Sequence, residues 1–197
     1  MSIPVDIPDP AELEIQRFKT DGYLLVPGLA EQELCERIRT EVLNSLQPLR
    51  GPAEFEVDVQ YPGAPTDRNS EGGNTSRRLL HAYGRSSVYR EWATSTTIKN
   101  YLQRLMGSEQ IMLSQAHHNC IMTKHPGFSS MTSWHQDVRY WRYDRAELVS
   151  VWLALGEETP ANGGLMFIPG SHNIELKRGS LDQHLFLRTD LEQNQAL

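Results

Sequence analysis

The feature that most constrains the fold is a change of pattern at Gly107. Before it, apolar residues recur at helical spacing; after it, short apolar runs follow one another between glycine and proline turns. Helices followed by short strands are typical of an α+β domain with a mainly β core and a helical layer on one side. The 197 residues suit one domain, because chains below about 250 residues seldom divide into several. We therefore expect a single domain over residues 1–197.

Three helices and six strands are predicted along this domain. Apolar residues that recur every three or four positions predict helices over 10–21, 31–46 and 87–106. Asp9 and Pro10 favour the start of the first helix, as its cap and its first-turn residue. Runs of apolar and β-branched residues bounded by turns predict strands over 23–26, 55–59, 111–124, 131–137, 148–155 and 165–168.

The composition excludes several classes of partner. A formal net charge of -6, without a dense lysine and arginine face, argues against nucleic acid. No stretch approaches the roughly 20 apolar residues that span a bilayer, and the N-terminus lacks a secretory pattern. Cys35 and Cys120 are too few for a disulfide scaffold. These features predict a reduced cytoplasmic protein without a membrane partner, and they leave its oligomeric state open.

The sharpest local motif is Trp134-His135-Gln136-Asp137. On a strand, His135 and Asp137 point to the same face, because side chains alternate. An imidazole and a carboxylate on one face can take adjacent positions on one metal ion, and a distant histidine completes the facial triad of non-haem Fe(II) enzymes. In a chain with 7 histidines, however, this spacing alone is explained more simply by a hydrogen-bonded pair.

The residues around this pair make the pattern specific. Five segments occur in order: Phe18–Tyr23, His135–Asp137, Val149–Leu155, Glu158–Leu165 and Ile168–His172. Together they closely resemble the phytanoyl-CoA dioxygenase family. The resemblance implies a double-stranded β-helix (jelly-roll, cupin-like) with the N-terminal helices packed on one side. It also implies an Fe(II)- and 2-oxoglutarate-dependent oxygenase that uses O2 to hydroxylate a small organic substrate and releases succinate and CO2, with ascorbate as a candidate reductant.

The same resemblance assigns the metal ligands. It makes His135 and Asp137 the catalytic residues that bind iron. Related halogenases lack this carboxylate and bind chloride in its place, so Asp137 favours hydroxylation. The substrate itself is not indicated, because no segment is specific for an acyl-CoA.

Four further residues are candidates for binding 2-oxoglutarate on the basis of the resemblance. Trp152 matches a tryptophan that lines the co-substrate pocket, although an apolar strand also explains it. Arg77 matches a basic residue that meets a 2-oxoglutarate carboxylate, with Arg78 as its competitor. Cys120 stands where relatives place a co-substrate contact, and a small buried thiol is the alternative. Gln136 lies between the metal ligands, but on an ideal strand it faces the opposite side.

The remaining histidines are given structural or peripheral roles. His172 belongs to the Pro-Gly-Ser-His turn, which is mostly structural in relatives, and His184 lies in a polar segment. His117 and His118 are adjacent, so on a strand they face opposite ways and form no same-face pair. One of the two is expected to border the substrate cavity.

One departure from the family pattern bears on function. Relatives carry a second iron-binding histidine and an arginine that clamps 2-oxoglutarate on later strands, and neither has a match before Leu197. We expect the chain to be a fragment that lacks its C-terminal strands. Two alternatives are a shortened, catalytically inactive ligand-binding relative and a chain in which His172 or His184 replaces the missing ligand. A cupin-like zinc hydrolase is a third, weaker functional class.

Overall fold

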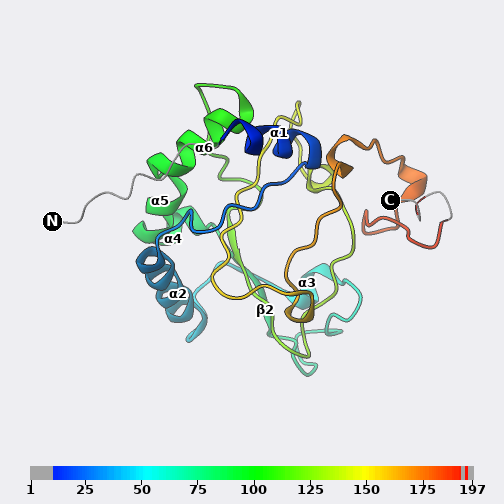
Figure 1. The fold of residues 1–197 in the computed structure, drawn as a ribbon. Coiled ribbons are helices and arrows are strands. Elements are labelled where there is room, and N and C mark those ends of the chain that lie inside the picture. The colour runs from blue at the N-terminus through cyan, green and yellow to red at the C-terminus, as the bar shows by residue number, and fades with distance from the viewer. Residues whose placement is uncertain (1–10, 192–193, 195–197) are drawn as a thin grey trace.

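The computed structural model describes residues 11–191 and 194. Six helices and three strands alternate in its first two thirds, and loops with short 3-10 turns make up the rest (Figure 1). The helices are α1 (Glu12–Asp21), α2 (Gln32–Leu46), α3 (Glu56–Val59), α4 (Ala82–Arg85), α5 (Ser87–Ala93) and α6 (Thr96–Met106). The strands are β1 (Ala53–Phe55), β2 (Ser76–Leu80) and β3 (Cys120–Met122). The 3-10 turns are Asp137–Tyr140, Pro160–Asn162, Ser171–Asn173 and Arg178–Ser180.

The three strands form one antiparallel sheet in the order β1-β2-β3. Leu79 of the central strand pairs with Ala53 on one side and with Ile121 on the other. Along β2, burial alternates with the strand period, so that Arg77 and Leu79 are buried and their neighbours are half-buried. The two faces of β2 therefore have different environments.

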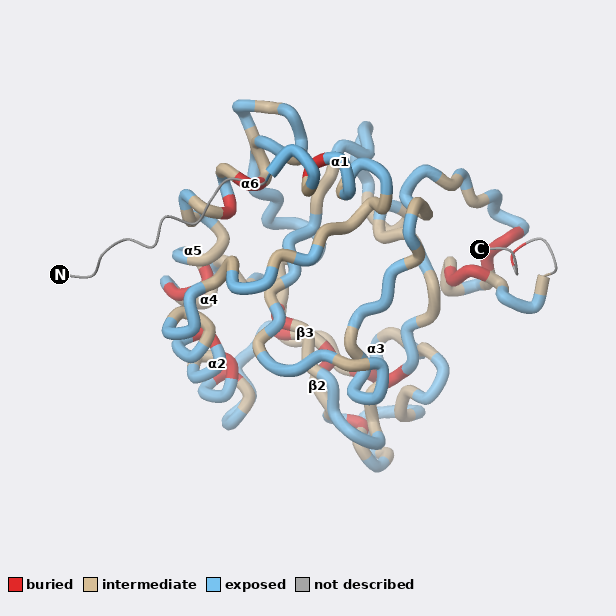
Figure 2. Tube along the Cα trace, in the orientation of Figure 1, coloured by how far each residue is buried: buried red, intermediate tan, exposed pale blue. Residues whose placement is uncertain are grey.

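Helices α2 and α5 cover the side of the sheet on which Leu79 lies. The main buried cluster joins these helices to the sheet and consists of Ile38, Val42, Leu79, Val88, Tyr89 and Ile121. Figure 2 shows buried positions along α2 and the sheet and again in the C-terminal segment, with long exposed stretches between them. In that segment, Leu181 and Leu187 form an isolated bridge, and Phe186 is 2% exposed.

The predicted helices are confirmed, with corrections at their ends. The helix predicted over 87–106 divides into α5 and α6, because Ser95 caps α6 by accepting a hydrogen bond from the backbone N–H of Ile98 at 3.2 Å. Asp9 and Pro10 lie outside the described residues. No helix of the described chain has both the length and the apolar character needed to cross a membrane.

Most of the predicted strands are wrong as paired strands. Only 120–122, inside the predicted 111–124, joins the sheet, and the 55–59 segment ends β1 and then forms α3. The segments 23–26, 131–137, 148–155 and 165–168 belong to no strand. A strand requires a neighbour for its backbone hydrogen bonds, and these segments have no ladder partner among the described residues. The domain is thus α+β with a small open sheet, and the double-stranded β-helix stays a prediction.

One of the unpaired segments, 148–155, still packs on the core through its last apolar residues. Leu153 and Leu155 pack against the main cluster, while Val151 and Trp152 just before them are exposed. The carbonyl of Leu155 accepts a hydrogen bond from Arg39 of α2 at 3.3 Å. Apolar side chains thus hold this segment on the core without a ladder.

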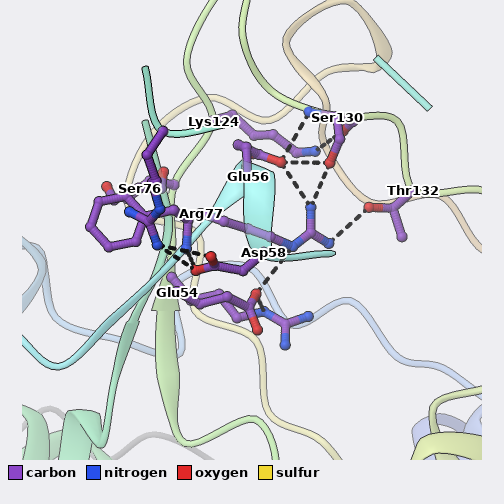
Figure 3. Close-up of polar contacts among 12 residues, drawn as sticks. Glu54, Glu56, Asp58, Ser76, Arg77, Lys124, Ser130 and Thr132 are labelled. Carbon is purple, nitrogen blue, oxygen red and sulfur yellow. Dashed lines mark hydrogen bonds and ion pairs between the residues drawn. The ribbon is translucent and has the colours of Figure 1, made fainter. Parts of the chain in front are cut away.

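A buried ion-pair network fastens β2 to the opposite loop (Figure 3). Arg77 is 1% exposed, and its guanidinium lies 3.4 Å from the carboxylate of Glu56, which is fully buried. The same guanidinium donates to the hydroxyls of Ser130 and Thr132, each at 3.0 Å. Ser130 also donates its backbone N–H to Glu56 at 3.1 Å. Because a buried charge is tolerated only when it is paired and hydrogen-bonded, these four residues form one unit.

We predict that Arg77→Met strongly destabilises the fold, because it leaves the Glu56 carboxylate buried without its cation. The expected loss in the free energy of unfolding is about 3–5 kcal/mol, measured by urea denaturation. Arg145→Met is the matched control, since Arg145 and its partner Glu147 are 80% and 73% exposed and such pairs contribute under about 1 kcal/mol. Adding Glu56→Gln to Arg77→Met should recover part of the loss. Equal losses for Arg77→Met and Arg145→Met would contradict the role of the network.

Candidate functional site

His135 and Asp137 lie side by side at the start of the 3-10 turn Asp137–Tyr140. His135 Nε2 is 3.2 Å from Asp137 Oδ1, and the other ring nitrogen, Nδ1, contacts the carbonyl oxygen of Ser133 at 2.7 Å. The backbone contact fixes the ring so that Nε2 faces the carboxylate. A histidine held by one nitrogen and free to bind through the other is the usual arrangement of a metal ligand.

The electrostatics of this pair follow from partial burial and mutual contact. Burial by itself would lower the pKa of His135, but the hydrogen bonds to Asp137 and Ser133 raise it above its ordinary value. Burial would raise the pKa of Asp137, yet the hydrogen bond with His135 and the proximity of His118 lower it. The metal-free pair therefore favours an imidazolium beside a carboxylate.

A second imidazole reaches Asp137 from another part of the chain. His118 Nδ1 is 3.4 Å from Asp137 Oδ2, the carboxylate oxygen that does not face His135. Burial lowers the pKa of His118, the Asp137 carboxylate opposes this shift, and the charges of Arg78 and His135 add to it. His117 and His118 lie in a turn rather than a strand, so both line the same cavity, and the expectation that they face opposite ways is wrong.

The three side chains open onto a cavity of about 330 Å³. This volume falls at the lower end of the range, about 300–1,000 Å³, that is usual for small-molecule sites. Its walls come from β2, from the turn before β3 and from the 132–141 segment. Besides the three residues above, they include Tyr61, Arg77, Arg78, Cys120, Thr132, Tyr140 and Trp141.

Two arginines of β2, Arg77 and Arg78, line the cavity, and their guanidinium groups differ in their contacts with other residues. The two terminal nitrogens of Arg77 donate within the buried network, and its Nε lies 3.3 Å from a carboxylate oxygen of Glu54. Its guanidinium lies 5.0 Å from the centre of the Tyr61 ring. Arg78 has only a 3.5 Å ion-pair distance from its Nε to Glu54, and its terminal nitrogens donate to no other described residue. Arg78 is therefore the guanidinium that is available to a ligand.

The other sequence candidates divide between the cavity and its surroundings. Cys120 lines the cavity, and burial raises the pKa of its thiol. Trp152 is 47% exposed, donates its indole N–H to Glu158 at 2.8 Å and is not part of the cavity wall. Gln136 faces away from the cavity and donates its amide to the carbonyls of Ser171 and Ile174.

Neither alternative histidine ligand reaches the pair in this structure. His172 contacts the carbonyl oxygen of Lys19 and packs against Gly22, whose φ of +81° suits glycine. His184 packs edge-on against Tyr61, with ring centres 5.3 Å apart, but does not line the cavity. Both therefore hold loops of the surrounding structure.

Two aromatic side chains, Tyr140 and Phe186, pack against the ring of His135. The rings of Tyr140 and Phe186 lie 5.7 and 5.8 Å from the His135 ring. Tyr140 donates its hydroxyl to the carbonyl of His184, and burial raises its pKa. The Leu187 N–H donates to the carbonyl oxygen of Trp134, the first residue of the motif, at 2.7 Å. Only the tertiary contacts reveal these supports, since Phe186 lies far from the motif in sequence.

His135 and Asp137 fit two adjacent positions of a metal ion by donor type and separation. Nitrogen and carboxylate donors suit divalent iron and related metals. Across residues 11–191 and 194, no set of three histidine, cysteine, aspartate or glutamate side chains is assembled as a group that could hold a metal. The geometry thus defines the class of site: a small cavity with an imidazole–carboxylate pair on one wall and an available guanidinium on another.

Comparison with known proteins identifies the family. Residues 18–196 match the family model described as phytanoyl-CoA dioxygenase (PhyH). This match covers most of the chain, and the protein belongs to that family, as its sequence motifs predict.

Individual relatives are distant and longer than this chain. It is 24% identical to a phytanoyl-CoA dioxygenase domain-containing protein 1 of Danio rerio, over 84% of this chain and 66% of the relative. It is 26% identical to the ectoine dioxygenases of Streptomyces avermitilis and Sphingopyxis alaskensis, over 87% and 81% of this chain. The chain spans 55% and 49% of those two enzymes. No solved structure matches it.

We predict that Asp137→Asn destabilises the metal-free protein more at pH 5.5 than at pH 8.5. Because the pKa of Asp137 is lowered in the folded protein, its carboxylate stabilises the fold above about pH 3.8. This stabilisation is lost as the pH falls through the pKa of Asp137 in the folded protein. Because the pKa of His135 is raised in the folded protein, its imidazolium gives a stabilising contribution that is complete below about pH 6.5. This contribution is lost as the pH rises through the pKa of His135 in the folded protein. The pair therefore contributes most between these limits.

Urea denaturation in the presence of a chelator measures this difference. The expected effect is below about 1 kcal/mol, because the Asp137 side chain is 38% exposed and solvent screens it. Asp144→Asn, at an exposed aspartate, is the control and should show no such pH dependence. A loss for Asp137→Asn that is equal at both pH values would rule out the charged pair.

Proposed function

We propose that this protein is an Fe(II)- and 2-oxoglutarate-dependent oxygenase that hydroxylates a small organic substrate. The observation that carries the proposal is the 3.2 Å approach of His135 Nε2 to Asp137 Oδ1 on the wall of the cavity. Family membership and the dioxygenase names of the relatives support the same reaction class. In this proposal Arg77 has a structural role. Ascorbate takes no part in the proposed reaction.

His135 and Asp137 would hold the iron. The Ser133 carbonyl keeps the His135 ring oriented, and the Tyr140 and Phe186 rings limit its motion. Metal binding requires neutral His135 and ionised Asp137, and the lowered pKa of Asp137 keeps it ionised at neutral pH. When bound, Fe(II) would allow O2 to react with 2-oxoglutarate and substrate, so that one oxygen atom of O2 enters the substrate and the other enters succinate as CO2 is released.

Arg78 would bind a carboxylate of 2-oxoglutarate. Its guanidinium reaches the cavity from β2, and Cys120 of the paired strand β3 lines the same cavity. A planar guanidinium binds a carboxylate through two parallel hydrogen bonds, which orients the ligand as well as neutralising its charge. Arg77, with the same charge, is committed to the buried Glu56 carboxylate.

The second candidate is a ligand-binding relative without catalytic metal. It is favoured by one observation, that no three-donor metal group is assembled within the described residues. In that case Arg78 and the imidazoles of the cavity would bind an organic anion directly. Metal-independent binding of 2-oxoglutarate separates this alternative from the oxygenase.

We predict that anaerobic Fe(II) and 2-oxoglutarate produce a saturable visible charge-transfer band with the 197-residue chain. His135→Ala and Asp137→Ala should abolish the band, since each removes a metal donor. His125→Ala is the control, because that imidazole contacts the carbonyl of Pro126 in a loop outside the cavity. Binding of 2-oxoglutarate without metal and without a band would instead support the ligand-binding relative.

We predict that Arg78→Gln weakens 2-oxoglutarate binding by roughly 10- to 100-fold, as expected for the loss of a charge-assisted hydrogen bond. The apparent Kd is read from the same band, at saturating Fe(II). Arg142→Gln, at an exposed arginine outside the cavity wall, should leave the Kd unchanged. An unchanged Kd in Arg78→Gln would exclude Arg78 as the carboxylate anchor.

A further inference from the structure

The turn that carries His118 is held in an unusual and well-anchored conformation. His118 has φ of +57°, a left-handed backbone that non-glycine residues seldom adopt. The next residue, Asn119, fixes the turn to α4: its carbonyl accepts from the Ala82 N–H at 3.0 Å and its side chain accepts from the Tyr83 N–H at 2.8 Å. Strained residues that are held in place by the surrounding structure cluster at functional sites.

This conformation aims the His118 imidazole at Asp137. Nδ1 lies 3.4 Å from Oδ2, and the ring meets the edge of Trp141 with centres 4.9 Å apart. The neighbouring His117 instead stacks on Trp141 at 5.9 Å, and no ion pair joins it to a carboxylate among the described residues. The two adjacent imidazoles therefore share the cavity and Trp141 but differ in what their nitrogens face.

The two oxygens of Asp137 are divided between two histidines. Oδ1 faces His135 Nε2, on the side where a metal would bind, and Oδ2 faces His118 Nδ1. A carboxylate that binds a metal through one oxygen leaves the other for a hydrogen-bond donor, and such donors fix the orientation of the ligand.

We propose that His118 is a positioning residue that donates from Nδ1 to Asp137 Oδ2 and so holds Oδ1 toward the metal. The proposal rests on the proposed function, because it takes Asp137 as a metal ligand. In this proposal His118 does not bind the metal directly, because it faces Oδ2 of Asp137 whereas His135 faces Oδ1. The left-handed backbone at His118 serves to bring Nδ1, rather than Nε2, to the carboxylate.

Substitutions at His118 separate positioning from ligation. His118→Asn keeps an N–H donor near the position of Nδ1, and asparagine tolerates a left-handed backbone. His118→Gln places its amide further out, near the position of Nε2. His118→Ala removes the donor, and His117→Ala is the matched control on the same turn and against the same Trp141 ring.

The measurement is the affinity of each 197-residue variant for Mn(II) alone, followed by the electron paramagnetic resonance signal of free Mn(II). We expect His118→Ala and His118→Gln to raise the Kd by about 10- to 100-fold, the usual effect of losing a residue that orients a metal ligand. His118→Asn and His117→Ala should stay near the unsubstituted protein. Circular dichroism establishes that each variant is folded.

Three outcomes overturn the proposal. Affinity that is unchanged in His118→Ala means that His118 does not orient Asp137. Affinity that falls equally in His118→Asn and His118→Ala means that His118 binds the metal itself or acts through packing. No Mn(II) binding by the unsubstituted chain removes the metal carboxylate on which both proposals depend. Failure of the proposed function alone looks different: Mn(II) affinity depends on His118 as expected, but Fe(II) and 2-oxoglutarate give no charge-transfer band.

Discussion

The buried pairing of Arg77 with Glu56 is the interaction on which the arrangement of this domain depends. Burying two charges is costly, and the cost is partly offset here by the hydroxyls of Ser130 and Thr132, which accept from the two terminal nitrogens of the guanidinium. Through these contacts β2 is joined to α3 and to the loop that leads into His135. The network is polar where most of the core is apolar, so it specifies which loop lies opposite β2 as well as stabilising it.

Burial alternates along β2, so buried residues and residues of the cavity wall follow one another in the sequence. Arg77 and Leu79 are buried, one in the ion-pair network and the other in the main cluster. Arg78 and Leu80, between and after them, are half-buried and line the cavity. Arg77 and Arg78 both line the cavity, but they have different roles because Arg77 is also paired with the buried Glu56 carboxylate.

Two walls of the candidate site come from segments that a β ladder does not hold. The His135 and Asp137 wall is supported by the Ser133 carbonyl, by aromatic rings and by the Leu187 N–H on Trp134. The opposite wall is a turn tied to α4 by Asn119. Specific side-chain contacts thus replace here the sheet hydrogen bonds that hold the region around β2, and the precision of the site depends on each of them.

The sequence by itself determined the family and the longer helices, and it proposed the pair of residues at the centre of the candidate site. Helical periodicity depends on near neighbours, so α1, α2 and the region of α5 and α6 were predictable, although the cap at Ser95 that separates α5 from α6 was not predicted. The motif around His135 and Asp137 was recognisable for the same reason, since its residues are contiguous. Strand pairing, in contrast, depends on distant partners, and most of the predicted strands did not form.

Only the tertiary structure decided which side chains share the cavity. The local pattern of Arg77 and Arg78 left both as anion-binding candidates, and the distant Glu56 and Ser130 engage Arg77 and leave Arg78 available. The facing of His118 toward Asp137 depends on a turn with a left-handed residue, which a strand interpretation of that segment excluded. Contacts between residues far apart in the chain carry no local signal, and for this reason they had to be observed.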